Sequence, residues 1–164
     1  MGSGGQRRAL AVIDIDGVVA DVRHRLHHLE RRPRRWPEFF AAADDDPALA
    51  VGVTLVHELA ATYDVAWFTG RHERLRRLTE VWLARHGLPE GPMAMRADED
   101  FRPAPVVKSE LLATLRDIAP VALVVDDDPE VLAVIARDGT PVRLADWVPR
   151  SATLARAQDV DGQT

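Results

Sequence analysis

Short apolar runs alternate with helical patterns along most of this chain, and that alternation limits the fold more than any other feature of the sequence. The apolar runs that read as strands are residues 10–13, 65–68, 92–95, 121–125 and 141–144. These runs are nearly continuous rather than alternating apolar and polar, which is typical of parallel strands covered on both faces. We therefore expect an α/β fold, with a Rossmann-like parallel sheet of about five strands and helices on both faces.

Segments with helical spacing separate these runs. In residues 47–62, an apolar side chain recurs at the spacing of one helix face, at Leu49, Val53, Val56 and Leu59. Further helices are predicted at 73–86, 106–118 and 129–137, and glycines follow the first and last of these. A chain of 164 residues is long enough for one domain with a complete hydrophobic core.

The two ends and one internal segment do not follow the alternation. Residues 1–8 and 151–164 are polar and rich in Gly or Ala, so we expect loose ends around a single domain at 9–150. Residues 21–46 predict an insertion after the first strand. Its basic side chains are Arg23, Arg25, Arg31, Arg32, Arg34 and Arg35, with His24, His27 and His28 among them.

Two interpretations of this insertion remain open. The arginines form a positive lip that attracts anionic substrates, or they belong to a solvated helical face that Trp36, Phe39 and Phe40 pack down. A zinc site made from the three histidines is geometrically possible on a helix, but no second cluster of ligands supports it.

Composition excludes several classes of function. There is no cysteine, which excludes disulfides, thiolate zinc sites and a cysteine nucleophile. No apolar run approaches the length of a membrane span, and the first residues lack the core of a signal peptide, so we expect a cytoplasmic protein with no membrane partner. The net charge of −5 argues against a protein that coats nucleic acid without sequence specificity. Of the 21 basic residues, Lys108 alone is a lysine, which suggests a site that needs a compact ammonium group.

Residues that can bind a phosphate group or a cation follow three of the predicted strands. They are Asp14 and Asp16 after the first, Thr69, Gly70 and Arg71 after the second, and Asp126, Asp127 and Asp128 after the fourth. Lys108 lies near the start of the helix that precedes the fourth strand. Ligands of open parallel sheets bind outside the carboxyl ends of the strands. We therefore expect these side chains to converge at one edge of the sheet.

Each group in this set has a chemical use. Several carboxylates in one pocket repel one another and need a cation, and an all-oxygen set suits Mg²⁺. Two carboxylates two residues apart can divide the work, one attacking phosphorus and the other handling the proton. Lys108 can neutralise the charge of a phosphoryl group, and Thr69 can donate a hydrogen bond to its oxygens. Taken singly, each motif is a common turn or cap, and Asp128 before Pro129 is expected to cap a helix.

The order of four motifs, DIDGV, FTGR, VVKSE and LVVDDDPE, resembles the signature motifs of the haloacid dehalogenase superfamily over about residues 9–147. Within that superfamily the chain is most similar to the phosphatase domain of polynucleotide kinase-phosphatases, because that family has a stretch like MRADEDFRPAPVVK. The resemblance implies a fold of this superfamily with a small cap at the insertion. It also implies a Mg²⁺-dependent phosphatase that forms a phospho-aspartyl intermediate.

The resemblance further implies roles for individual residues. Asp14 would be the nucleophile and a metal ligand, and Asp16 the general acid and base, with its backbone carbonyl on Mg²⁺. Lys108 would be catalytic and would bind phosphate together with Thr69, Gly70 and Arg71. Asp126 and Asp127 would hold the metal or its waters. Arg96 and Arg102 fall on basic positions of the substrate side.

The sequence also departs from the family pattern. Val18 stands where the family often has Thr, and Asp128 stands where a basic residue can occur, so we expect no catalytic role for Asp128. No G-x-x-x-x-G-K-[ST] motif of the kinase half is present. The expected substrate is a nucleotide or a nucleic-acid 3′-phosphate, with another small phosphorylated metabolite as the alternative. No obligate protein partner is evident.

Two classes of protein without enzymatic activity can carry similar residues, namely receiver domains and phosphate-binding modules. A receiver domain also places aspartates, a threonine and a lysine on a parallel sheet, but there the lysine comes last, whereas Lys108 precedes Asp126. A non-catalytic phosphate-binding module would not need both Asp14 and Asp16. The sequence therefore favours an enzyme over both kinds of module.

Overall fold

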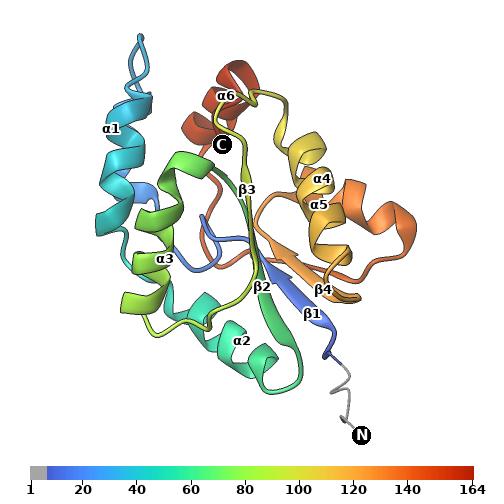
Figure 1. The fold of residues 1–164 in the computed structure, drawn as a ribbon. Coiled ribbons are helices and arrows are strands. Elements are labelled where there is room, and N and C mark those ends of the chain that lie inside the picture. The colour runs from blue at the N-terminus through green and yellow to red at the C-terminus, as the bar shows by residue number, and fades with distance from the viewer. Residues whose placement is uncertain (1–6) are drawn as a thin grey trace, which may run out of the picture.

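The computed structural model describes residues 7–164, and its centre is a parallel sheet of five strands (Figure 1). The strands are β1 (Leu10–Ile13), β2 (Asp64–His72), β3 (Met93–Arg96), β4 (Val121–Asp126) and β5 (Val142–Leu144). Their order across the sheet is β3-β2-β1-β4-β5, and every neighbouring pair is parallel. The predicted α/β fold with a five-stranded parallel sheet is confirmed.

Helices cover both faces of the sheet, which explains the continuous apolar runs. On one face, α2 (Ala50–Ala60) and α3 (Arg76–Arg85) pack over Ala11 and Ile13 of β1. On the other, α4 (Ala104–Arg116) and α5 (Pro129–Ile135) pack over Leu10 and Val12. All four residues of β1 are buried, because successive side chains enter opposite cores. Within residues 7–164, no helix is long and apolar enough to cross a membrane.

The predicted elements differ from the structure mainly at their ends. The second strand is longer than predicted and continues through Thr69–Gly70–Arg71, because His72 still pairs with Arg96 of β3. Asp128 caps α5 as expected, since its carboxylate accepts from the backbone N of Glu130 at 2.9 Å. A short 3₁₀ turn after α5 ends at Gly139, whose left-handed φ of 85° no β-branched residue would tolerate.

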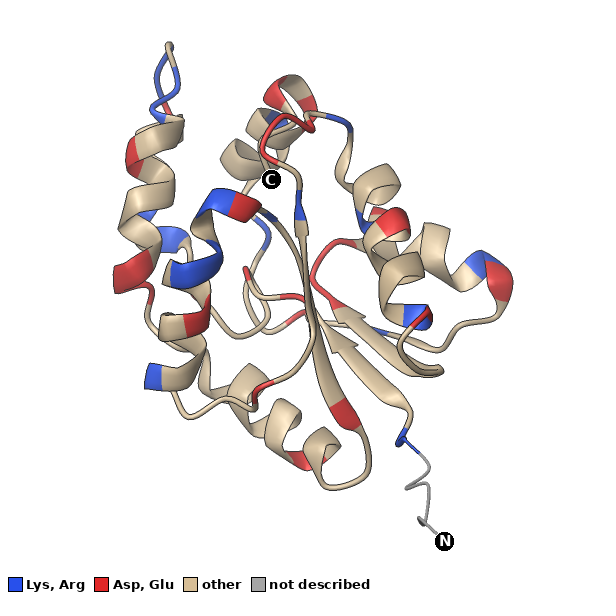
Figure 2. Ribbon diagram, viewed as in Figure 1, with Lys and Arg blue, Asp and Glu red and all other residues tan. Residues whose placement is uncertain are grey.

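The insertion at 21–46 is a folded layer. It consists of the 3₁₀ helices η1 (Arg23–Leu29) and η2 (Ala42–Asp45) on either side of α1 (Trp36–Ala41). Leu29, Trp36, Phe39 and Phe40 are buried in a small core of their own, which agrees with the packing interpretation. The loop that joins η1 to α1 is nevertheless strongly basic and projects from the molecule (Figure 2).

The carboxyl-terminal segment corrects one expectation. Residues 151–164 were expected to be a loose tail, but α6 (Ala152–Asp161) forms there and Ser151 caps it. Ala157 enters the core of the insertion, and Asp161 accepts from Trp36 Nε1 at 2.7 Å and from Arg34 Nη1 at 3.1 Å. The partners of α6 lie more than a hundred residues earlier in the chain, so a local pattern could not reveal them. A loose end was also expected at residues 1–8, and residues 1–6 of it lie outside the described part of the chain.

We predict that Asp161→Ala loosens α6 without unfolding the sheet. The substitution leaves the partly buried Arg34 and Trp36 donors without their acceptor, which costs on the order of 1–3 kcal/mol. Trypsin cleavage after the exposed Arg156 in α6 should therefore be about tenfold faster than in the wild type. Asp159→Ala, an exposed position on the same helix, is the matched control. Equal cleavage rates in all three proteins would mean that Asp161 does not hold the helix.

Candidate active site

The sheet brings the predicted polar residues together at its carboxyl edge. Asp14 directly follows β1, and β1 lies between β2, which carries Thr69, and β4, which ends at Asp126. Lys108 lies in the second turn of α4, and this position brings its side chain to the same edge of the sheet. A cavity of about 60 Å³ lies there, and its walls include Asp14, Asp16, Gly17, Thr69, Gly70, Lys108 and Asp127.

A buried lysine between two carboxylates forms the floor of this site. Lys108 Nζ lies 3.0 Å from Asp14 Oδ1 and 2.6 Å from Asp126 Oδ2, and it is 5.0 Å from the centre of the Phe68 ring. Burial alone would lower the pKa of Lys108, but the carboxylates of Asp126 and Asp14 outweigh it and raise that pKa well above its usual value. Lys108 therefore carries a full positive charge at neutral pH.

The neighbouring carboxylates carry more negative charge than Lys108 balances. Burial first, and then the charge of Asp126, raise the pKa of Asp14 well above its ordinary value, while Lys108 opposes the change. Burial and Asp126 likewise raise the pKa of Asp127 to about 7. Both shifts have the same cause, which is that buried carboxylates crowd together without enough compensating charge. A cation at this place would stabilise their ionised forms.

The carboxylate geometry fits a divalent cation. One oxygen each from Asp14, Asp126 and Asp127 lies within 4.8 Å of the others, and hard oxygen ligands of this kind suit Mg²⁺. The closeness depends on Gly17, because a Cβ there would lie 2.2 Å from Asp127 Oδ2. Asp127 faces the cavity, whereas Asp126 is fully buried and already accepts from Lys108 and from the backbone N of Asp128. Asp14 and Asp127 are thus the carboxylates that an entering ion would meet first.

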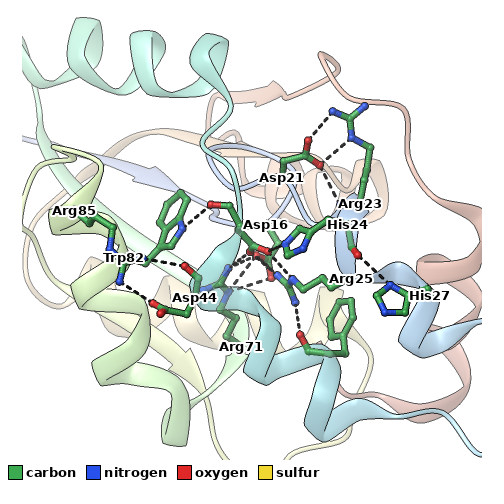
Figure 3. A network of polar contacts seen from close by, with 12 residues as sticks. Asp16, Asp21, Arg23, His24, Arg25, His27, Asp44, Arg71, Trp82 and Arg85 are labelled. Carbon is green, nitrogen blue, oxygen red and sulfur yellow. Dashed lines mark hydrogen bonds and ion pairs between the residues drawn. The ribbon is translucent and has the colours of Figure 1, made fainter.

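Asp16 belongs to a second charged cluster, which links the site to the insertion (Figure 3). Arg71 Nε lies 3.1 Å from Asp16 Oδ1, and Arg25 Nη2 lies 3.1 Å from the same oxygen. Both arginines also bind Asp46, Arg25 through two hydrogen bonds of 2.8 Å and Arg71 at 3.1 Å. Arg25, Arg71 and Asp46 have fully buried side chains, so this quartet is a structural ion-pair network with Asp16 at its solvent end.

The network fixes the charge of Asp16. Burial tends to raise the pKa of Asp16, but Arg71 and Arg25 outweigh burial and lower that pKa to about 2. At neutral pH, Asp16 is therefore a carboxylate that can accept a proton. Before it can donate one, it has to move away from the two guanidinium groups and become protonated.

Thr69 and Gly70 of β2 form another part of the cavity wall. Thr69 is buried and its hydroxyl oxygen accepts from the backbone N of Arg71 at 3.1 Å, which leaves the hydroxyl proton to donate toward the cavity. Gly70 lies against the backbone of Thr164, and a Cβ at Gly70 would come within 2.6 Å of it. Arg71, expected beside them as a phosphate ligand, instead points into the quartet and does not line the cavity.

The structure places Arg96 and Arg102 away from the cavity. Arg96 is buried and donates to the backbone carbonyls of Gly70 at 3.0 Å and of Arg102 at 2.9 Å, so it braces the loop of Gly70 from behind. Arg102 is half exposed and pairs with Asp100 and Glu110, each at 2.7 Å. Neither side chain is among those that line the cavity.

Several residues of the site had no recognisable signal in the sequence. Arg25 and Asp46 looked like ordinary charged residues of the insertion, because burial and ion pairing depend on the tertiary fold. His24 pairs with Asp46 at 2.7 Å, and the one possible metal cluster in residues 7–164 contains none of the three histidines. The expected tail at 151–164 also contributes to the site, since Ser151, Leu154 and Gln158 line the cavity.

Comparisons with known proteins agree with this geometry. The model of the polynucleotide kinase PNKP phosphatase domain matches residues 8–143. A chain in the structure of the Pnkp1/Rnl/Hen1 complex is 22% identical with a TM-score of 0.69, over 85% of this chain and 45% of that one. This chain thus spans less than half the length of that relative.

Other solved structures share the fold at lower identity. The class C acid phosphatase from Bacillus anthracis with tungstate bound is 13% identical with a TM-score of 0.62, over 95% of this chain and 80% of that one. The haloacid dehalogenase-like hydrolase SP0104 from Streptococcus pneumoniae is 12% identical with a TM-score of 0.64, over 93% and 91%. No curated protein sequence matched.

The family match covers the whole sheet except the end of β5, and it includes every predicted carboxylate and Lys108. The chain therefore belongs to the family of the polynucleotide kinase PNKP phosphatase domain, a hydrolase family with the haloacid dehalogenase fold.

Proposed function

We propose that this chain is a Mg²⁺-dependent phosphomonoesterase that acts through a phospho-aspartyl intermediate on Asp14. The observation that carries the proposal is the arrangement of Lys108 between Asp14 and Asp126, with Asp127 facing the same small cavity. A structural ion pair alone would not need the additional, partly buried carboxylate of Asp127, whose raised pKa reflects a surplus of negative charge.

Substrate binding uses the walls of the cavity. The phosphoryl group would accept from Thr69 and from Lys108, which neutralises it and Asp14 together. Asp14 and Asp127, with Asp126 behind them, would hold the Mg²⁺ ion. The bound ion supplies positive charge that keeps Asp14 ionised and offsets the charge of the phosphoryl oxygens.

The reaction has two displacement steps at phosphorus. A carboxylate oxygen of Asp14 attacks phosphorus, and the bond from phosphorus to the leaving oxygen breaks. The leaving oxygen keeps the electron pair and takes up the proton of protonated Asp16, which becomes a carboxylate. A water molecule then attacks the phosphorus of phospho-Asp14, and the Asp14 carboxylate leaves with inorganic phosphate as the product. The Asp16 carboxylate, which the two arginines keep ionised, accepts a proton of this water and is again ready to act as the acid.

For the substrate we propose a phosphate monoester on a nucleoside, either a mononucleotide or a nucleic-acid 3′ end. The family match supports this class, and the relative of known structure is part of an RNA repair complex. The net charge of −5 and the small cavity favour a short substrate over a long duplex. Another small phosphorylated metabolite is the alternative, which a panel of sugar phosphates and nucleotides would reveal.

Asp14→Asn tests the proposed nucleophile. The amide keeps the shape of the side chain but cannot attack phosphorus, so hydrolysis of an aryl phosphate in the presence of Mg²⁺ should fall by several orders of magnitude. EDTA should abolish wild-type turnover, and added Mg²⁺ should restore it. Circular dichroism checks that the variant is folded. A variant that keeps about a tenth of wild-type kcat would overturn the assignment of Asp14.

Lys108→Arg tests whether the site needs a compact ammonium group. Arginine keeps the charge, but its wide planar group does not fit between carboxylates 3.0 Å and 2.6 Å from one nitrogen. We expect Lys108→Arg to lose nearly as much kcat/KM as Lys108→Ala. Near-wild-type turnover by the arginine variant would show that positive charge alone is sufficient and that the single lysine of the chain has no special role.

A further inference from the structure

The cavity is too small to hold a whole nucleotide. Its volume of about 60 Å³ leaves room for little more than the reacting phosphoryl group beside Lys108 and Thr69. The remainder of any substrate must therefore lie at the mouth of the cavity, and the side chains there decide which substrates bind well.

Two arginines from distant parts of the sequence line this mouth. Arg23 lies at the start of η1 in the insertion, and Arg150 lies just before α6. Their side chains are 57% and 37% exposed, so both can meet a ligand from solvent. Arg96 and Arg102, the basic residues expected on the substrate side, lie outside the cavity wall.

Arg23 is held in one orientation by its neighbour Asp21 (Figure 3). Its Nε and Nη2 atoms donate to the two oxygens of Asp21 at 2.8 Å and 2.6 Å, and its backbone N donates to the same carboxylate at 3.0 Å. These bonds leave the N–H groups of Nη1 for a ligand, since a guanidinium has five donors. The side chain is thus oriented in advance and retains donor capacity.

Arg150 is held more loosely. Its one ion pair in the described chain joins Nη1 to Asp128 Oδ1 at 3.4 Å, and that oxygen already accepts from the backbone N of Glu130 in the cap of α5. Exposed pairs at such distances contribute little free energy. Arg150 can therefore exchange Asp128 for a phosphate at small cost, while Asp128 keeps its role as a helix cap.

Packing between α6 and the insertion fixes the two walls relative to each other. Leu154 and Ala157 of α6 contact the aromatic core of the insertion, and Asp161 binds Arg34 and Trp36. Arg23 and Arg150 thus line one cavity from two segments that are packed together.

We propose that Arg23 and Arg150 are the side chains that bind the phosphodiester next to the reacting phosphate, and that any preference of this chain for a 3′-phosphorylated oligonucleotide over a nucleoside monophosphate depends on them. The inference rests on the proposed phosphatase function and adds the two residues that determine its substrate preference. Guanidinium groups bind phosphate through paired hydrogen bonds, and a monophosphate offers no second phosphate for them.

The test compares two substrates that differ only in additional phosphodiesters, thymidine 3′-monophosphate and a 3′-phosphorylated thymidine tetranucleotide. Arg23→Ala and Arg150→Ala should each raise KM for the tetranucleotide about five- to tenfold, and the double variant more. The KM for the monophosphate should change less than about twofold. Each substitution should also lower the dependence of log KM on log salt by about 0.7 for the tetranucleotide. Arg85→Ala is the matched control, because Arg85 is similarly exposed and paired with Asp44 but does not line the cavity.

Equal changes for both substrates, or an unchanged KM for the tetranucleotide, would overturn the inference. An aryl phosphate, assayed with Mg²⁺ in the same proteins, separates this failure from a failure of the proposed function. If the wild type hydrolyses the aryl phosphate but the tetranucleotide shows no dependence on either arginine, the phosphatase proposal stands and the inference fails. If no phosphomonoester is hydrolysed, both fail.

Discussion

The ammonium group of Lys108, buried between Asp14 and Asp126, is the interaction on which the rest of this site depends. Three carboxylates meet where the carboxyl ends of β1 and β4 adjoin, and buried carboxylates at that spacing repel one another strongly. One lysine offsets only part of that charge. A divalent cation would offset the surplus, and in the proposed function the cation and Lys108 together would attract a phosphate group to this edge of the sheet. Loss of the ammonium would leave buried charges unpaired, which is strongly destabilising.

The second charged cluster ties the chemistry to the insertion. Arg25 of η1 and Arg71 of β2 share Asp46, and both hold Asp16 at the solvent end of the network. Because of this arrangement, Asp14 and Asp16 lie close together in the sequence but have opposite shifts in pKa. Burial and neighbouring carboxylates raise the pKa of Asp14, whereas the two guanidinium groups outweigh burial and keep Asp16 ionised at a pKa of about 2. The insertion therefore contributes to the charge state of the site as well as covering it.

Sequence patterns were sufficient for the sheet and for the residues at its edge. Nearly continuous apolar runs predict parallel strands that are covered on both faces. The carboxyl ends of such strands meet at one edge of the sheet, so Asp14, Thr69 and Asp127 come together whatever the conformation of the connecting loops. The patterns were insufficient where burial or long-range contact decides the outcome. Arg71 and Arg96 were expected to bind substrate, but both are fully buried and bind groups of the protein itself. The helix at 152–161 has only a weak local pattern, and its stability comes from Trp36 and Arg34, which are distant in the chain.

The central claim is that Asp14 becomes covalently phosphorylated during turnover, and rapid acid quenching followed by peptide mass spectrometry tests it most directly. The enzyme is mixed with an aryl phosphate and Mg²⁺, quenched within the first turnover and digested. We expect the mass of one phosphoryl group on the peptide that contains Asp14, and none on that peptide from Asp14→Asn. Full turnover with no phosphorylated peptide, or with the phosphoryl group on another residue, would contradict the account.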